Sequence, residues 1–252
     1  MTRCALVTGA ASGIGCALAS GLAAQKMEVI VSDLDLDAAQ QTVEAIKAEG
    51  GKAHAIKLDV TKQDDIDAVV DRFPQIDVLI NNAGIQFVAK LEEFPIDRWR
   101  LINDILLVAP AMLTRAVLPG MKQRGFGRIV NIGSIHALIA SPYKSAYVAA
   151  KHGLLGFSKV VALETADFDI TINTICPSYV KTPLVDKQVT QQAKEHGISE
   201  DDVINNIMLE PMPKKAFIGM DELLGSVNFL VSAAAKNMTG QTLVLDGGWT
   251  VK

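Results

Sequence analysis

Short apolar runs alternate with longer amphipathic segments along the whole chain. Apolar runs of strand length, bounded by Gly, Pro, Asn or Asp, lie at residues 4–8, 28–32, 52–58, 77–80, 127–132, 170–176 and 241–245. Helical spacing is clearest at residues 36–48, 64–73, 145–166 and 221–232. Strands that alternate with helices over short connections pair in parallel. The pattern therefore predicts an α/β fold, with one domain over residues 1–252 and a doubly wound sheet of about seven parallel strands with helices on both faces.

Two segments depart from this alternation. Residues 95–124 have a long helical pattern that is interrupted at Pro110 and Pro119. Residues 182–215 form a long polar excursion that contains Pro183, Pro211 and Pro213. Because long insertions in α/β domains are usually functional, residues 182–215 are predicted to be a substrate lid or specificity loop.

The composition is that of a globular chain with a full core, and it narrows the classes of partner. Hydrophobic residues make up 49% and charged residues 21% of the 252 residues, and the net charge is −4. This charge leaves no basic stripe, which argues against nucleic acid and anionic membranes as partners. The longest apolar run, 105–113, is shorter than the ~20 residues that span a bilayer. The first residues also lack the apolar region of a signal peptide, so a cytoplasmic protein is expected.

The cysteines Cys4, Cys16 and Cys176 are far apart and form no Cys-x-x-Cys pair. An odd number of cysteines argues against a disulfide framework. They are interpreted as small buried residues, and no metal site is predicted.

A glycine-rich turn follows the first predicted strand and leads into a helical segment. Glycines let the backbone approach a pyrophosphate, and a helix N-terminus offers free N–H groups and a partial positive charge. This order predicts a dinucleotide site, although a glycine-rich turn that binds nothing has the same spacing. The cofactor-binding residues predicted here are Gly9, Ser12, Gly13, Ile14 and Gly15.

Asp33 stands at the carboxyl end of the second predicted strand. There an acidic side chain binds the adenosine ribose hydroxyls of NAD and repels the 2′-phosphate of NADP. Asp33 therefore favours NAD as the cofactor; the alternative is a helix N-cap for the segment that begins near residue 36. Asp59 and Val60 end the third strand and are predicted to border the adenine.

A Tyr-x-x-x-Lys motif lies at Tyr147 and Lys151, in a segment with helical spacing. Positions i and i+4 share a helix face, and a nearby positive charge favours the ionised phenol, which is a general base for an alcohol proton. Ser134, after the fifth predicted strand, is placed to bring a hydroxyl to the same point. Taken alone, the Tyr-x-x-x-Lys spacing also occurs often by chance on amphipathic helices.

Together, these motifs resemble the short-chain dehydrogenase/reductase family along the whole chain. The matching elements are Thr8-Gly9-x-x-x-Gly13-x-Gly15, Asn81-Asn82-Ala83-Gly84, Asn103, Ser134 with Tyr147-x-x-x-Lys151, and Pro177 followed by Thr182. The resemblance implies a Rossmann-like fold, a homotetramer, and cofactor contacts at Asn82, Ala83, Gly84, Tyr147, Lys151, Pro177 and Thr182.

The same resemblance implies the catalytic roles. Tyr147 would be the acid/base, and Lys151 would lower the pKa of Tyr147 and bind the nicotinamide ribose. Ser134 would polarise the reacting oxygen. Asn103 would hold a backbone carbonyl and a water in a proton relay.

Within the family, the residues around these motifs resemble the subfamily that oxidises D-3-hydroxybutyrate. In that subfamily the residues equivalent to Gln86, His136, Lys144 and Gln188 clamp the substrate carboxylate. A short hydroxy acid does require a cation and hydrogen-bond donors one carbon chain away from the alcohol site. Alternatives remain open: Lys144 as a surface lysine, His136 as a structural histidine or second proton carrier, and Gln188 as dependent on loop closure.

The expected activity is NAD-dependent, reversible oxidation of 3-hydroxybutyrate to acetoacetate. The rival within the fold acts on a different hydroxy acid, a polyol, a steroid or a 3-oxoacyl thioester, and a rival of another class binds NAD as a silent sensor. One departure from the family is Ser178, where most relatives have glycine, and the substitution is expected to restrict the backbone if that position needs a positive φ.

Overall fold

A computed structural model describes residues 2–251, except the side chains of Pro183, Leu184, Lys187, Gln191, Glu195 and His196. It contains a seven-stranded sheet with the order β3-β2-β1-β4-β5-β6-β7. All six strand pairings are parallel. The predicted doubly wound sheet is therefore confirmed. The strands are β1 (Cys4–Thr8), β2 (Glu28–Asp33), β3 (Lys52–Lys57), β4 (Val78–Asn81), β5 (Phe126–Ile132), β6 (Asp169–Pro177) and β7 (Thr242–Leu245).

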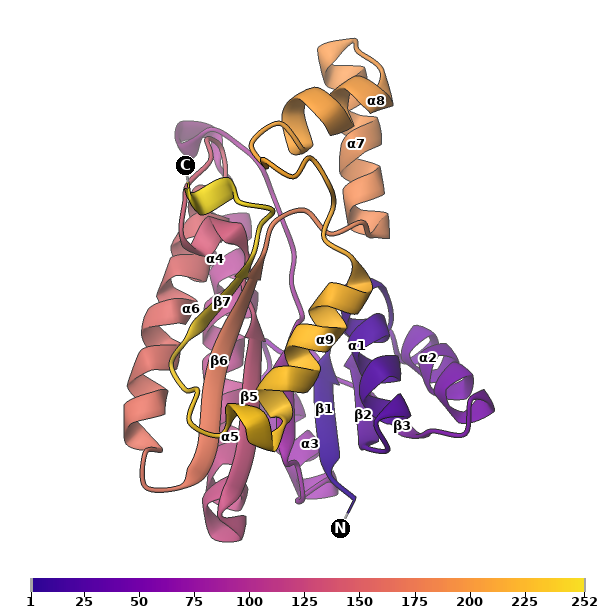
Figure 1. Ribbon diagram of the computed structural model, residues 1–252, viewed down its shortest axis with the longest axis vertical. Helices are drawn as coiled ribbons and strands as arrows, with labels where there is room; N and C mark the ends of the chain where they lie inside the picture. The colour runs from indigo at the N-terminus through magenta and orange to yellow at the C-terminus, as the bar shows by residue number, and fades with distance from the viewer. Residues whose placement is uncertain (1, 252) are drawn as a thin grey trace.

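Helices cover both faces of the sheet (Figure 1). Buried side chains of α1, α2 and α9 pack on one face, and those of α3, α5 and α6 pack on the other. Because both faces are covered, the central strands are continuously apolar, as expected of a parallel sheet. The helices are α1 (Gly13–Ala24), α2 (Leu36–Ala48), α3 (Gln63–Arg72), α4 (Ile96–Asn103), α5 (Ala109–Arg124), α6 (Ser145–Glu164), α7 (Pro183–His196), α8 (Glu200–Val203) and α9 (Met220–Val231).

The strand order reverses between β1 and β4. The chain leaves β1 toward β2 and β3, and leaves β4 in the opposite direction toward β5, β6 and β7. The connections that follow β1 and β4 therefore diverge and leave a crevice at the carboxyl ends of these strands, which is where ligands bind in open α/β sheets. The fold thus predicts the position of a site independently of any sequence motif.

The predicted interruption of residues 95–124 is only local. Ile96–Arg124 is one continuous helical segment, with a π-helical turn at Asp104–Val108 in which the Ala109 N–H donates to Asp104 O. Pro110 lies just after this turn and has no N–H to donate, so the wider turn absorbs the proline without ending the helix. Among residues 2–251, this is the one helix long and apolar enough to cross a membrane. Leu113 and Val117 of this helix are buried in the cluster that packs between the sheet and helices α3, α5 and α6. The helix is therefore part of the hydrophobic core.

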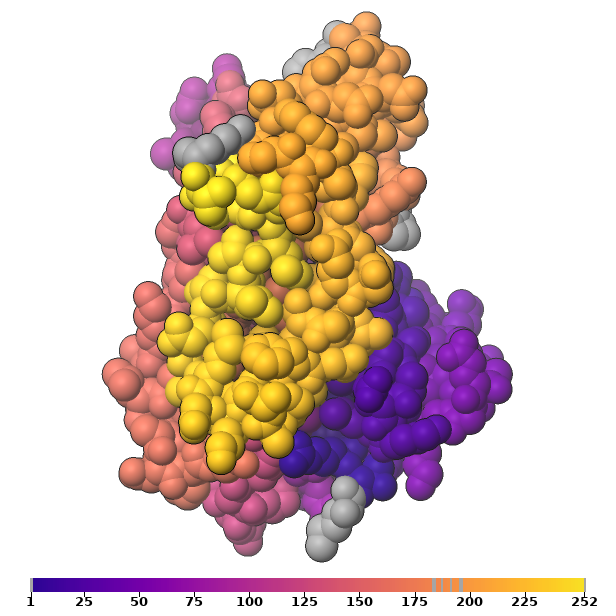
Figure 2. All heavy atoms as spheres, in the orientation of Figure 1, coloured from indigo at the N-terminus to yellow at the C-terminus, as the bar shows by residue number. Residues whose placement is uncertain are grey.

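Residues 182–215 are largely helical, which corrects the expectation of a loop. They contain α7, α8 and a π-helical turn at Ile204–Met208. Figure 1 shows α7 and α8 projecting beyond the carboxyl ends of the strands. Figure 2 shows the same segment as a lobe at one end of the molecule, next to the C-terminal residues. The segment therefore lies where a lid over the crevice is required.

The base of this lid is tied to the body of the protein. Val180 and Ile218, which flank the insertion, form a parallel bridge. The Lys214 N–H donates to Gly247 O (3.1 Å), and the Tyr179 ring stacks on Trp249 at a centroid distance of 6.1 Å. The two ends of the lid therefore leave the body side by side.

Candidate active site

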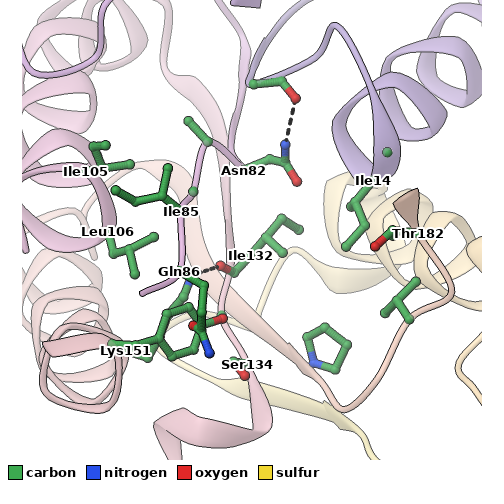
Figure 3. A pocket seen from close by; sticks show the side chains of 18 of the residues that line it. Ile14, Asn82, Ile85, Gln86, Ile105, Leu106, Ile132, Ser134, Lys151 and Thr182 are labelled. Carbon is green, nitrogen blue, oxygen red and sulfur yellow. Dashed lines mark hydrogen bonds between the residues drawn. The ribbon is translucent and has the colours of Figure 1, made fainter. Parts of the chain in front are cut away.

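A cavity of about 430 Å³ lies at the carboxyl ends of the strands, beneath the lid. Figure 3 shows that its side chains come from elements far apart in the sequence, including α1, β5, α6 and the start of the lid. Of the predicted site residues, those that line it are Gly9, Ser12, Gly13, Ile14, Asp33, Val60, Asn82, Ala83, Gly84, Gln86, Ser134, His136, Lys144, Tyr147, Lys151, Pro177, Thr182 and Gln188. The topology therefore brings together residues that the motifs indicated separately.

The glycine-rich turn has the form of a phosphate-binding cradle. Gly13 opens α1 with φ +55°, and a Cβ built there would meet no described atom within 4 Å, so the backbone faces open space. Ser12 is the N-cap of α1, and its side chain makes no capping bond to the described residues. The N–H groups of a first helical turn lack partners within the helix. A pyrophosphate fits this arrangement of free donors and partial positive charge.

Gly9 and Gly15 serve the packing of the turn itself. A Cβ on Gly15 would lie 2.2 Å from Gly9 O, and one on Gly9 would lie 2.8 Å from the Ala83 Cα. The Asn82 amide donates to Thr8 O (2.9 Å) and to Gly9 O (3.1 Å), and Figure 3 draws one of these two bonds. Gly15 is absent from the described cavity lining, so it acts by allowing this close approach.

Asp33 holds the turn and faces the cavity. Its carboxylate accepts from Ala11 N–H (3.0 Å) and Asp35 N–H (3.2 Å). The N-cap of α2 is Asp35, whose side chain accepts from Ala38 N–H. The alternative role of Asp33 as that helix cap is therefore wrong, and its position fits a carboxylate that binds ribose hydroxyls.

The adenine end of the cavity is apolar, and Asp59 does not contribute to it. Leu34, Leu58 and Val60 line the cavity there. Asp59 instead accepts from the Thr61 hydroxyl (2.6 Å) and N–H (3.0 Å), and these bonds lower its pKa. Among the described lining residues Asp59 is absent, so the structure does not support its predicted adenine contact.

Ser134, Tyr147 and Lys151 meet at the centre of the cavity. Ser134 follows β5, and Tyr147 and Lys151 are one turn apart on α6. The Lys151 ammonium donates to Ile132 O at 2.6 Å and lies 5.7 Å from the Tyr147 ring centroid. Figure 3 draws this hydrogen bond as a dashed line that ends at Ile132. The shared helix face that the spacing predicted is therefore present.

The pKa of Tyr147 shifts in the direction opposite to the expectation. Burial raises the pKa of the phenol, and the neighbouring Ser134 hydroxyl only partly opposes this. Burial also lowers the pKa of Lys151 to about 8. The protein's own groups therefore hold the phenol protonated at neutral pH, and the pKa lowering that the resemblance implies for Lys151 is not produced by the protein alone.

His136 is buried beside Ser134, and both its ring nitrogens face serines. Its Nε2 lies 2.7 Å from Ser141 Oγ and its Nδ1 lies 3.5 Å from Ser134 Oγ. Burial, followed by repulsion from Lys144, lowers the pKa of His136 to about 4. The ring is therefore uncharged at neutral pH. The predicted bond from His136 to a substrate carboxylate stays a prediction.

Lys144 reaches the cavity from the start of α6, and Gln86 and Gln188 line the same space. Burial lowers the pKa of Lys144, which is half-buried and therefore not the surface lysine of the alternative interpretation. The Ala89 N–H donates to Tyr143 O (3.0 Å), which ties the segment after Gln86 to the residue before Lys144. Besides Lys151, the cavity thus presents a second cation, Lys144, and the two amides of Gln86 and Gln188 to the space that Ser134 and Tyr147 line.

Asn103 lies at the end of α4, outside the described lining of the cavity. Its side chain donates to Trp99 O (2.9 Å) within the same helix. The proton-relay role that the resemblance implies for Asn103 stays a prediction.

Several lining residues were not predicted. Ser178 lines the cavity, and its hydroxyl faces Met212 Sδ at 3.4 Å. Among the described non-glycine residues, positive φ occurs at Lys26, Tyr143 and Lys215, so Ser178 imposes none of the expected strain. Tyr179 also lines the cavity, whereas the Leu184 side chain lies outside the described residues. The unpredicted apolar lining is Leu34, Leu58, Ile85, Ile105, Leu106, Ile132, Ile135, Val180 and Val185.

Within the described chain, no cluster of three His, Cys, Asp or Glu residues could hold a metal ion. The three cysteines are free thiols.

Comparisons with known proteins agree with this geometry. Residues 3–193 match the family model described as short chain dehydrogenase. The chain is 43% identical to a D-beta-hydroxybutyrate dehydrogenase of Rhizobium meliloti, over 100% of both chains. It is 44% identical to one of Cupriavidus necator, over 99% of this chain and 98% of the relative. A solved structure provisionally assigned as an NAD(P)-dependent gluconate 5-dehydrogenase of Beutenbergia cavernae, with NADP bound at low occupancy, superposes with a TM-score of 0.89. That protein is 31% identical, over 99% of this chain and 97% of its own.

Proposed function

Because the chain belongs to the short-chain dehydrogenase family, we propose that it catalyses the NAD-dependent, reversible oxidation of (R)-3-hydroxybutyrate to acetoacetate. One observation carries the substrate: half-buried Lys144 lines the same cavity as Ser134 and Tyr147. This arrangement suits a molecule with an alcohol at one end and an anion a short carbon chain away. The two full-length relatives that carry the hydroxybutyrate dehydrogenase name support the same substrate.

The alcohol end is handled by the two hydroxyl side chains. Ser134 donates a hydrogen bond to the reacting oxygen, and the Tyr147 phenolate accepts the alcohol proton. A bound nicotinamide nucleotide supplies the hydride acceptor. In the reverse direction the protonated Tyr147 returns its proton to the carbonyl oxygen of acetoacetate. Lys151, held by Ile132 O, keeps a positive charge close to the phenol and has N–H groups left for a ribose hydroxyl.

The carboxylate end is held by Lys144 together with Gln86 and Gln188. A cation that is largely shielded from water attracts an anion more strongly than an exposed one does. Burial lowers the pKa of Lys144, so its ammonium loses its proton more readily than an exposed lysine would. Anion binding by this residue is therefore expected to weaken in alkaline solution.

The preference for NAD rests on Asp33. Its carboxylate already accepts from two backbone N–H groups, at 3.0 and 3.2 Å, which hold it against the cavity. A 2′-phosphate placed there would meet its negative charge. A solved relative contains bound NADP and is named as NAD(P)-dependent. The kcat/KM of this protein must therefore be measured with both NAD and NADP.

Closure of the lid, residues 182–215, brings Gln188 and Val185 over the substrate and excludes water. The free thiols of Cys4, Cys16 and Cys176 suit a reducing compartment, and the proposed location is the cytoplasm.

A homotetramer is proposed as the assembly. Large apolar side chains remain exposed on adjoining turns of α6 and at the ends of α4 and α9, among them Val160, Leu163, Ile96 and Phe229. Exposed apolar side chains of this kind are typical of surfaces that associate with a second copy. Light scattering of the purified protein at micromolar concentration tests this, and a monomer would contradict it.

The activity is tested with purified protein, both enantiomers of 3-hydroxybutyrate, longer hydroxy acids, a polyol and a 3-oxoacyl thioester, each with both nucleotides. We expect the highest kcat/KM for the (R)-enantiomer with NAD. A higher value for a thioester with NADPH would replace this function with that of a thioester reductase. Nucleotide binding without turnover of any substrate would indicate a sensor.

A further inference from the structure

A row of buried polar side chains crosses three neighbouring strands on the face of the sheet that α6 covers. Asn81 of β4, Asn131 of β5 and Thr174 of β6 are paired directly with one another across these strands. Each of the three is at most 5% exposed. The side chain of α6 that meets this row is Ser158, which is also buried. Burial of polar groups is costly unless they are hydrogen-bonded, and apolar side chains would fill the same space without that cost.

Ser158 uses all of its hydrogen-bonding capacity in this row. Its hydroxyl donates to Leu154 O at 2.8 Å, because a carbonyl oxygen can only accept. It accepts from the Asn131 amide at 3.0 Å, and the Thr174 hydroxyl, at 3.1 Å, is left to donate to it. Asn131 in turn accepts from the Asn81 amide at 2.8 Å. The four side chains therefore form one connected network that joins three strands to α6.

The network gives α6 a second point of attachment to β5. At the catalytic centre, the Lys151 ammonium donates to Ile132 O at 2.6 Å. Ser158 comes seven residues later, so its bond to Asn131 lies about 10 Å further along the helix. Tyr147, Lys151 and Ser158 share one helix face, since they stand at positions i, i+4 and i+11. One attachment lets a helix pivot, whereas two on the same face fix its rotation and its position along the strand. Apolar contacts have no preferred direction and fix neither.

We infer that Ser158 is a positioning residue for the reaction: its bonds to Asn131 and Thr174 fix the position of α6 against the sheet. Ser134 directly follows the Asn131 end of β5, and Tyr147 lies on α6. The position of α6 therefore sets how the Tyr147 phenol lies relative to the Ser134 hydroxyl. The inference rests on the proposed function only for Tyr147 as the acid/base, because the network itself is independent of the substrate.

The kinetic test compares Ser158→Ala with Thr165→Val. Thr165 caps the end of α6 and is fully buried, but in the described chain its hydroxyl contacts only carbonyls of that helix, the nearer being Val161 O at 2.8 Å. Each variant removes one buried hydroxyl, so both should lower the urea midpoint. Only Ser158→Ala should lower kcat, about tenfold, because a small misplacement of a catalytic group is costly. Thr174→Val keeps the size of its side chain and should lower kcat less, and adding it to Ser158→Ala should cause no further loss. A wild-type kcat for Ser158→Ala, an equal loss in Thr165→Val, or additive losses in the double variant would each overturn the inference.

A spectroscopic measurement makes the test independent of the substrate. In protein labelled with ¹³C at the hydroxyl-bearing carbon of its tyrosines, the signal that disappears in Tyr147→Phe belongs to Tyr147. The chemical shift of this carbon follows the surroundings of the phenol, which include the Ser134 hydroxyl. We expect the signal to move in Ser158→Ala and to stay in place in Thr165→Val. An unmoved signal in Ser158→Ala, or equal movement in both variants, would overturn the inference. If the wild type oxidises no hydroxybutyrate, the proposed function fails, whereas the tyrosine signal still decides the role of Ser158.

Discussion

Removal of the Lys144 charge is the most direct test of the proposed substrate. Lys144→Ala takes away the cation that lines the cavity together with Gln86 and Gln188, and it leaves Ser134, Tyr147 and the glycine-rich turn in place. A hydrogen bond to a charged group contributes about 1.5–3 kcal/mol, so kcat/KM for hydroxybutyrate should fall roughly 10- to 150-fold. Because Lys144 is only half-buried, solvent screening places the expected loss toward the lower end of this range.

The assay compares two substrates in two variants. Hydroxybutyrate carries the carboxylate, whereas 2-butanol has the same secondary alcohol without it. Lys144→Ala should lose activity on hydroxybutyrate and change little on 2-butanol, and the KM for NAD should remain as in the wild type. Lys159→Ala is the matched control, because this exposed lysine lies on the same helix, α6, and outside the described lining of the cavity. Equal losses on both substrates, or a parallel loss of NAD binding, would refute the carboxylate clamp.

The remaining predictions concern the acid/base, the nucleotide preference and the phosphate cradle. Burial raises the pKa of Tyr147, so oxidation, which needs the phenolate, should accelerate as pH rises through the alkaline range, while acetoacetate reduction should not; stopped-flow rates in both directions check this, and a flat oxidation profile would contradict it. Tyr147→Phe should lower kcat by at least ~10²-fold with NAD still bound in calorimetry, and near-normal turnover would exclude Tyr147 as the acid/base. Asp33→Asn should raise kcat/KM with NADP relative to NAD, and an unchanged ratio would remove Asp33 from the nucleotide choice. Gly13→Ala and Gly50→Ala both place a Cβ at a positive φ with no described atom within 4 Å, but Gly13 alone lines the cavity. Each should cost about 1 kcal/mol of stability in urea unfolding, and only Gly13→Ala should raise the KM for NAD; equal KM values would show that the turn does not hold the nucleotide.

The sheet could be predicted because its signals are local. A buried parallel strand is a short apolar run, and β1 is Cys4–Thr8 in both the prediction and the structure. The segment after the third strand was harder to predict. β3 ends at Lys57, and Leu58 and Val60 line the cavity while Asp59 accepts from the Thr61 N–H and hydroxyl. An Asp side chain commonly bonds to the backbone two residues on, and the prediction that paired Asp59 with Val60 did not consider this local bond.

The helical lid could have been predicted from the position of its prolines. The sequence analysis counted Pro183 among the prolines of a polar excursion, yet it lies at the first positions of α7, where proline is favourable because its missing N–H needs no partner. The Thr182 side chain accepts from Val185 N–H and caps the same helix. The raised pKa of Tyr147 could not have been predicted, because burial arises from residues that only the tertiary fold brings together. The spacing of a motif places two side chains on one face, but it does not determine the dielectric around them.

The paired ends of the lid have a consequence for how this fold can change. Since the Val180–Ile218 bridge closes the insertion at its base, the chain between these residues starts and finishes side by side. Lengthening such an insertion changes its closure entropy only slowly, and the strands below it keep their register. Residues 181–217 can therefore be exchanged between relatives as a cassette, while β5 and α6 continue to hold the catalytic serine, tyrosine and lysine. Leu209 and Met212 of this segment pack in the core cluster beside α1 and α9, so an exchanged segment must keep apolar side chains at these two positions for the fold to remain stable.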